Sequence, residues 1–136
     1  MAKQSGITMT VSVDDSNGTA RDISNDVVSV NFSTPRGVQD VTGLDKSAIE
    51  RLLLLADGKV SIECVYNTTA STGSHTVLKT ISSNSSSRTV ALTPLGGSAL
   101  SMEMKGSNVS WARAQSGELM ISAEFELADG TVPSWS

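Results

Sequence analysis

The chain has 136 residues, a formal net charge of −4 at pH 7 and only 4% aromatic residues. This length predicts a single domain over residues 1–136, and the scarcity of aromatics predicts a core built mainly from aliphatic side chains. The acidic balance, without any run of Lys or Arg, disfavours a nucleic-acid-binding protein, which needs a basic patch to displace counterions from phosphates.

One cysteine, Cys64, excludes an intramolecular disulfide framework. It falls on the apolar side of a predicted strand, so we expect a small buried hydrophobe. The first residues lack the apolar segment of a secretory signal, and the longest apolar run, Leu52 to Ala56, is too short to span a bilayer. We therefore expect a protein that is made in a cytoplasm, is not exported by the ordinary route and has no membrane partner.

The first third of the chain reads as short strands separated by turns. Alternating apolar and polar residues predict a strand over Ile7 to Val13. The polar run Asp14 to Gly18 predicts a hairpin turn, because Asn-Gly supplies the positive-φ positions that such turns need. A short strand follows over Ala20 to Ile23, then a bend, and then a clear strand over Val27 to Ser33, where one face carries Val28, Val30 and Phe32.

The next segment predicts a long loop and a helix. Thr34 to Asp45 is polar and aperiodic, and loops of about a dozen residues are usually functional or disordered. Ser47 and Glu50 have the spacing of a capping box, so we expect a helix from Ser47 to the stop at Asp57-Gly58. Leu54 points away from the apolar face of that helix. Either the helix is buried on two sides, or a neighbouring subunit covers Leu54.

The rest of the chain is again mostly β. A third long strand is predicted over Val60 to Asn67, followed by one or two helical turns over His75 to Ile81 and a Ser/Asn loop. Further strands are predicted over Arg88 to Thr93, Ala99 to Lys105 and Val109 to Arg113. The last two are joined by a turn at Gly106-Ser107-Asn108, and Val109 and Trp111 are expected to face inward.

Glu118 to Leu127 has the clearest alternation in the chain. Its apolar residues fall on one side, and its carboxylates, Glu118, Glu124 and Glu126, fall on the other. A period of two predicts a strand with a dry face and a wet, acidic face.

The sequence contains no combination of residues that indicates a catalytic, metal-binding or phosphate-binding site. A nucleophilic triad needs a His near a Ser or Cys and steered by a carboxylate, and the only histidine, His75, lies in a loop-like, Ser/Thr-rich context typical of a surface side chain. Asp14-Asp15-x-Asn17 lacks the Glu that would close a calcium loop, and Gly96-Gly97 does not open a helix with Lys. We predict no catalytic, cofactor-binding or metal-binding residues, and no enzyme.

The order of elements resembles that of the tail tube proteins (major tail proteins) of long-tailed bacteriophages. The resemblance is carried by Arg21-Asp22-Ile23-Ser24, Asp40-Val41-Thr42-Gly43-Leu44-Asp45, Ala56-Asp57-Gly58-Lys59-Val60-Ser61-Ile62, His75-Thr76-Val77-Leu78 and Ser122-Ala123-Glu124-Phe125. The match spans nearly the whole chain but is a diffuse pattern of strands and turns. With the strand pattern, it predicts a mainly β fold: an antiparallel β-sandwich or barrel with one short flanking helix.

The resemblance implies a structural virion protein that polymerises as stacked, hexameric rings into a hollow tail tube. Its partners would be further copies of itself, a tape-measure protein and tail-tip or terminator proteins, and DNA would pass through the channel without specific binding. Localisation would be the virion tail, after synthesis in the host bacterial cytoplasm. We expect the wet face to line the channel through Glu103, Glu118, Glu124 and Glu126, because an acidic wall repels phosphates. Expected subunit contacts are Leu54, Pro35, Arg36, Asp40 and Trp135.

The main alternative is a β-sandwich binding or decoration module, such as an Ig-like domain on a virion or cell surface. It would present exposed aromatic side chains to a ligand. Only Trp111 and Trp135 are available for that role, and Trp111 is expected to face inward.

Overall fold

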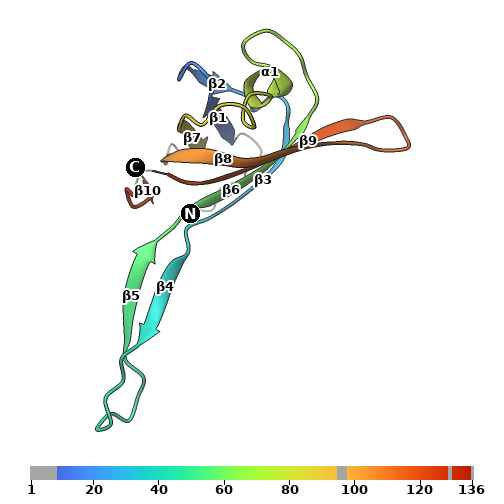
Figure 1. Ribbon diagram of the computed structural model, residues 1–136. Coiled ribbons are helices and arrows are strands. Elements are labelled where there is room, and N and C mark those ends of the chain that lie inside the picture. Colours follow the sequence, from blue (N-terminus) through green and yellow to red (C-terminus); the bar gives the residue numbers. More distant parts are fainter. Residues whose placement is uncertain (1–8, 95–97, 129, 136) are drawn as a thin grey trace, which may run out of the picture.

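The computed structural model describes residues 9–94, 98–128 and 130–135. It is an antiparallel β-sandwich with one short helix and two hairpins that project from it (Figure 1). In chain order the elements are β1 (Thr10–Asp14), β2 (Ala20–Asp22), β3 (Val27–Ser33), β4 (Arg36–Asp40), β5 (Arg51–Ala56), β6 (Lys59–Val65), α1 (Ser74–Leu78), β7 (Arg88–Thr93), β8 (Leu100–Arg113), β9 (Leu119–Leu127) and β10 (Ser134–Trp135).

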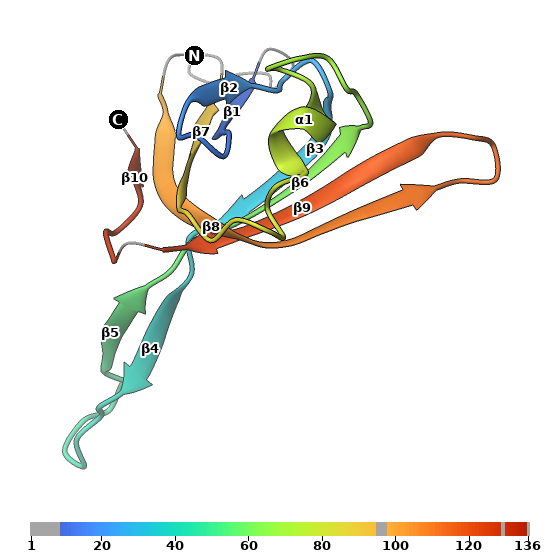
Figure 2. The same ribbon diagram turned by 45° about the horizontal axis from the view of Figure 1, so that its top comes forward.

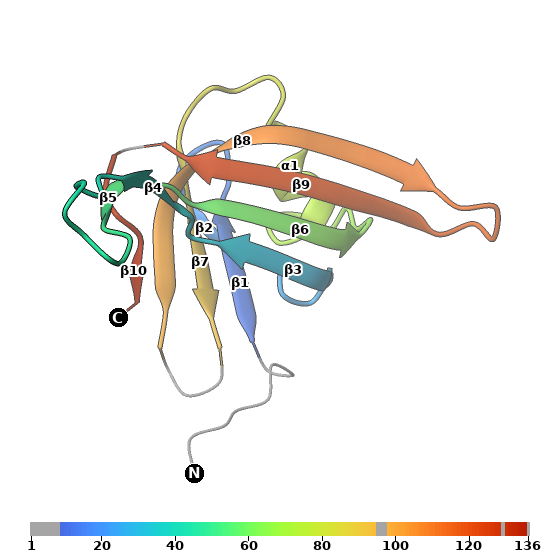
Figure 3. The same cartoon turned by 90° about the horizontal axis from the view of Figure 1, so that it is seen from below.

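One folded sheet forms both layers of the sandwich, in the order β2-β1-β7-β8-β9-β6-β3. β8 belongs to both layers: its first residues, Leu100 to Met104, pair with β7, and residues from Met104 to Arg113 pair with β9. Figure 3 shows β7 and β1 running across the direction of β3, β6 and β9. We call β3, β6, β9 and the Lys105–Arg113 part of β8 the long sheet, and β2, β1, β7 and the first part of β8 the short sheet.

The core lies between the two layers and is aliphatic, as the composition predicted. Alternate residues of each strand point into it, with Phe125 as its only buried aromatic residue among the described part of the chain. Its members include Val11, Val13, Val60, Ile62, Cys64, Val90, Leu92, Leu100, Met102, Met104, Ile121, Ala123 and Phe125. Cys64 is fully buried, and this burial raises the pKa of its thiol to about 12. The expectation of a small buried hydrophobe at Cys64 is confirmed.

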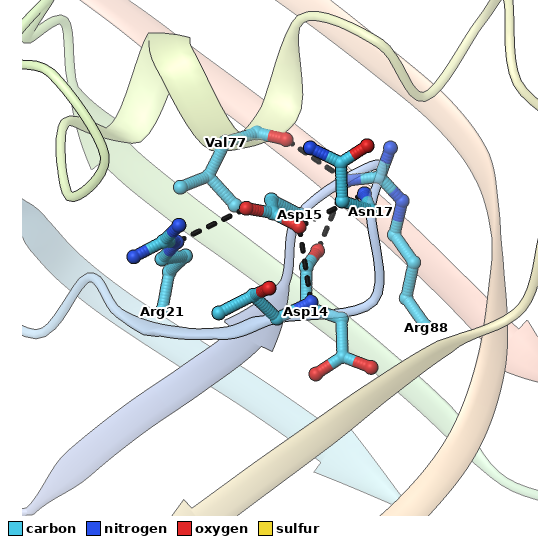
Figure 4. A network of polar contacts seen from close by, with 7 residues as sticks. Asp14, Asp15, Asn17, Arg21, Val77 and Arg88 are labelled. Atoms are coloured by element: carbon cyan, nitrogen blue, oxygen red, sulfur yellow. Dashed lines mark hydrogen bonds and ion pairs between the residues drawn. The ribbon is translucent and has the colours of Figure 1, made fainter.

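The helix α1 closes one end of the core and is held there by a buried arginine. Val77, Leu78 and Ile81 are buried, as predicted for the helical turns of that segment. The guanidinium of Arg88 donates to the carbonyl of Val77 at 2.8 Å and to that of Asp14 at 3.1 Å, which links α1 to the end of β1 (Figure 4). In the neighbouring turn, the carboxylate of Asp15 accepts from its own turn's backbone and from Arg21, which fixes the hairpin predicted there.

The segment from residue 34 to residue 57 differs most from the prediction. The expected loop contains β4, and the expected helix is replaced by β5, which pairs with β4 as an antiparallel hairpin. Thr42 supplies the physical reason. Its hydroxyl accepts from the backbone N–H of Glu50 at 2.9 Å, and Val41 N–H donates to Glu50 O, so the backbone of the supposed capping-box residue is engaged across the hairpin. The short flanking helix of the fold is α1 instead.

Two bulges explain the other differences. Gly106-Ser107-Asn108 is a bulge within β8 and not a turn, so Val109 to Arg113 continues the same strand. A bulge between Val27 and Ser29 takes Val28 out of the strand pairing and leaves it 61% exposed, although Val30 packs on the core as expected. Trp111 faces the core side of β8 but is 41% exposed, because this part of β8 is an edge strand of the long sheet. The predicted residues 7–8 and 95–97 lie outside the described part of the chain.

Candidate functional site

The outward face of the long sheet is polar over most of its length, up to an apolar row of Val65, Met120 and Ala112 next to the β8–β9 hairpin. Strand pairing places Asn31, Ser61, Glu124 and Asn108 in one row, and Ser29, Glu63, Ser122 and Ser110 in the next. We call the polar outward residues of this sheet the polar face: Ser29, Asn31, Ser33, Lys59, Ser61, Glu63, Lys105, Asn108, Ser110, Ser122, Glu124 and Glu126. All of them are exposed.

The charges on the polar face nearly cancel. It carries three carboxylates, Glu63, Glu124 and Glu126, and two amines, Lys59 and Lys105, which gives a net charge of −1 per chain (2 − 3). Glu126 is paired across the strands with both lysines. Within the described residues, however, the ion pairs closer than 4 Å are elsewhere, at Arg21–Asp15 and Lys46–Glu50. The face is therefore a hydroxyl and amide surface with sparse, mixed charge, less acidic than β9 alone suggested.

The four glutamates predicted for this wall are not all together. Glu124 and Glu126 lie side by side on the polar face, bordering a concavity of about 320 Å³ that Lys59, Ser61 and Ser107 also line. Glu103 lies in the short-sheet part of β8, where its carboxylate accepts from the hydroxyl of Thr89 at 2.7 Å. Glu118 precedes β9 at the tip of the β8–β9 hairpin and accepts from Ser116.

The β4–β5 hairpin, which we call the arm, extends away from the sandwich as an exposed, apolar segment (Figure 2). Its strands and tip expose eight large apolar side chains, of which Leu44 and Leu55 are the most exposed, at 108% and 91%. The set is Val38, Val41, Leu44, Ile49, Leu52, Leu53, Leu54 and Leu55. A surface of this kind in a folded protein marks an interaction site.

Four of the five predicted contact residues lie on the arm or at its base. Pro35 accepts the N–H of Asp57 where the arm leaves the sandwich, and Arg36 donates from Nε to the carbonyl of Leu54 at 2.9 Å. Asp40 accepts from Thr42 near the tip, and the Thr42 hydrogen bonds lower the pKa of its carboxyl. The fifth residue, Trp135, lies on β10 with its ring 5.7 Å from that of Phe32, at the end of β3 from which the arm departs.

The two lateral edges of the long sheet are open. Among the described residues, no strand pairs with the outer edge of β3, and Lys105 to Arg113 of β8 pairs with β9 alone. The open edge of β8 was not predicted, because the sequence pattern indicated two separate strands in place of β8. Open edges are ready templates for pairing with another chain, and a monomer would need to protect them.

Among the described residues, no group of three or more potential metal-binding side chains occurs, and no helix is long and apolar enough to cross a membrane. His75, which was predicted to be a surface side chain, is partly buried among aromatic rings. It lies between Tyr66 and Trp111, with ring-centre distances of 4.7 and 5.9 Å.

The fold is similar to solved structures of phage-derived particles. A chain from the tail of an empty gene transfer agent particle, refined with C6 symmetry, has a TM-score of 0.73 and 18% identity, over 98% of this chain and 99% of that one. A chain from the virion of a native gene transfer agent gives 0.72 and 16% over the same shares. A chain from the 6-fold symmetrised baseplate of the anti-feeding prophage gives 0.65 and 9%, over 100% and 97%.

Sequence comparison adds no relative, because no family model matches the chain and no curated protein does. At these low identities the structural likeness establishes the fold. The chain has the antiparallel β fold of phage-derived tail structures, which is the fold that its resemblance to tail tube proteins predicted.

Proposed function

We propose that the chain is a structural virion protein that assembles as stacked, six-membered rings into a tail tube, with a channel for genome delivery along the axis. The observation that carries the proposal is the long sheet, which combines two open lateral edges with a polar face over most of its outward side. The six-fold symmetry of the similar tail and baseplate structures supports the number six.

Ring closure would join the two open edges. The strands β8, β9, β6 and β3 are each antiparallel to the next, so β3 of one copy would run antiparallel to β8 of its neighbour. The two edges would therefore form an ordinary antiparallel pair. The contact would be heterologous, because it joins two different surfaces of the chain, and heterologous contacts close into a ring when the rotation between copies allows it. A closed sheet has no edges left to aggregate.

In such a ring the polar face would line the channel. Glu124 and Glu126 would point toward the axis, Glu118 would border one rim at the hairpin tip, and Glu103 would lie away from the lining on the short sheet. The lining would be rich in Ser and Asn with a small negative charge, which gives a polyanion no array of cations to bind. DNA would then pass without specific contact.

The arm would join one ring to the next. It leaves the long sheet at the end where β3 finishes and β6 begins, opposite to the end that carries the β8–β9 hairpin. Fully burying one leucine or valine side chain is worth roughly 1.5–3 kcal/mol, so eight exposed apolar side chains per copy can drive stacking. The remaining expected partners are a tape-measure protein inside the tube and tail-tip or terminator proteins at its ends, in a virion assembled in the host bacterial cytoplasm. The role is structural and needs no catalytic residue.

Electron microscopy of the purified protein tests the proposal. Six-fold rings or tubes are the expected result. Replacing residues 41–50 at the arm tip by a short turn should abolish tubes and leave single rings, while circular dichroism stays that of a β protein. As a control that changes neither end of the long sheet, Ser61→Ala on the polar face should leave stacking intact. A protein that remains monomeric under all conditions would contradict the proposal and favour a binding or decoration module.

A further inference from the structure

Trp111 is a large apolar residue that is partly exposed at one edge of the long sheet. Its indole N–H donates to Nδ1 of His75 at 3.2 Å, and His75 in turn packs against Tyr66. One side of the indole is thus anchored by α1, and 41% of the residue is still exposed. Tryptophan, with tyrosine and arginine, is enriched among the few residues that dominate the binding energy of a protein interface.

The other edge of the long sheet borders a cleft that presents several aliphatic side chains. The cleft has a volume of about 430 Å³ and lies between β3 and β1, where it is lined by Met9, Val11, Ser24 and the run Val27–Val30. The hydroxyl of Ser24 is already engaged, because it accepts the N–H of Val11 at 2.7 Å and donates to Asp22. The cleft therefore offers aliphatic side chains for contact beside polar atoms of the serines and of the β3 backbone.

The tryptophan and the cleft lie on the same side of the sheet and at the same height. Trp111 is paired with Ile121, Ile121 with Cys64, and Cys64 with Val27, so a single row of cross-strand partners runs from one edge to the other. Ile121 and Cys64 face the core, which places Trp111 and Val27 on the core side as well. When two copies join edge to edge, Trp111 of one copy comes to the cleft of the other, and the four-residue length of the cleft tolerates the stagger of a closed barrel.

We infer that the cleft between β1 and β3 is the socket for Trp111 of the adjacent copy, and that this contact is the lateral anchor of the assembly. The inference rests on the proposed ring and deepens it by naming the contact. The occupant is a second copy of this chain because the two surfaces match in position and chemistry only when copies are joined through β8 and β3. Pairing of backbone edges alone is not selective, whereas an indole packed against the aliphatic side chains of the cleft fixes which copy joins and in which register.

Tryptophan fluorescence tests the inference with little disturbance of the fold. In Trp135→Phe, Trp111 is the only tryptophan, and its emission should shift to shorter wavelength on assembly while acrylamide quenching falls several-fold. The matched variant, Trp111→Phe, reports Trp135 instead and serves as the control for assembly as such. If rings form and Trp111 stays as accessible to acrylamide as in the monomer, the socket is wrong although the ring stands. If no rings form from the wild-type protein, the proposed function itself fails.

A crosslink supplies an independent measurement. Val28 is 61% exposed and lines the cleft, so Val28→Cys with Trp111→Cys should give covalent oligomers on oxidation of assembled protein. Cys64 should take no part, since it is fully buried. The control pair, Val28→Cys with Trp135→Cys, should remain monomeric on denaturing gels. Trp111→Ala alone should weaken lateral association by about 30-fold, the usual effect of truncating a hot-spot residue. Equal crosslinking of both pairs would overturn the inference.

Discussion

The bulge at Gly106 leaves no room for a side chain. A Cβ built on Gly106 would lie 2.4 Å from Cγ2 of Ile81 and 3.3 Å from its Cβ. Ile81 is 6% exposed and branched at Cβ, so rotation about χ1 cannot clear both contacts. Gly106→Ala should therefore destabilise the fold by about 1–3 kcal/mol, the range for overpacking a filled core. Because the bulge is where β8 passes from one sheet to the other, the same variant should also disturb the polar face.

The assay is urea unfolding followed by circular dichroism, at a concentration where the protein is monomeric. Ile81→Ala alone should cost about 2–5 kcal/mol through the cavity it leaves. In the double variant the new methyl group occupies part of that cavity, so the two losses should fall short of additivity by at least about 1 kcal/mol. Ser107→Ala, next in the chain and exposed, is the control and should stay within about 0.5 kcal/mol of wild type. Strict additivity of Gly106→Ala and Ile81→Ala would refute the reasoning.

Three further predictions concern the arm, the buried thiol and the buried guanidinium. Replacing Leu53 and Leu55 by Ser should leave monomer unfolding within about 0.5 kcal/mol, since both are exposed, yet abolish tubes in electron micrographs; an unchanged yield of tubes would contradict a stacking role for the arm. Cys64, whose pKa burial raises to about 12, should resist thiol reagents at pH 8 until the chain unfolds. Since its folded pKa lies above the unfolded value of 9.0, its contribution to stability is present below pH 9 and lost as the pH rises toward 12, so reagent uptake at the unfolded rate would argue against burial. Arg88→Leu should cost about 2–4 kcal/mol in urea unfolding, because the carbonyl of Val77 and other acceptors lose their donor; a variant as stable as wild type would show that these bonds are dispensable.

The half-buried strands could be predicted from sequence because apolar residues, which face the core, alternate in them with polar residues, which face the solvent. β6, β7 and β9 alternate strictly, and their boundaries fall within a few residues of the predicted ones. The arm could not be predicted in this way. Its strands have no core to face, so Leu52 to Leu55 are apolar on both sides and carry no period of two. Local spacing then favoured a helix at Ser47 and Glu50, and the hydrogen bonds that decide the matter come from Thr42, eight residues before Glu50.

In the candidate site, the residues of a single strand could be predicted, but their neighbours on other strands could not. Glu124 and Glu126 were placed correctly on an outward face because that depends on β9 alone. Their neighbours Lys59 and Lys105, which nearly neutralise the face, depend on the register of three strands far apart in the sequence. The same holds for the open edges, because Gly106-Ser107-Asn108 has turn composition and only pairing with β9 reveals one continuous strand.

The central claim is that the long sheets of successive copies join into one ring with the polar face inward. A density map of the purified assembly at side-chain resolution tests it most directly. The account predicts β3 of each copy paired antiparallel with Lys105–Arg113 of the next, and Glu124 and Glu126 directed at the axis. A map with these two glutamates on the outer wall, or with β3 left unpaired, would contradict it.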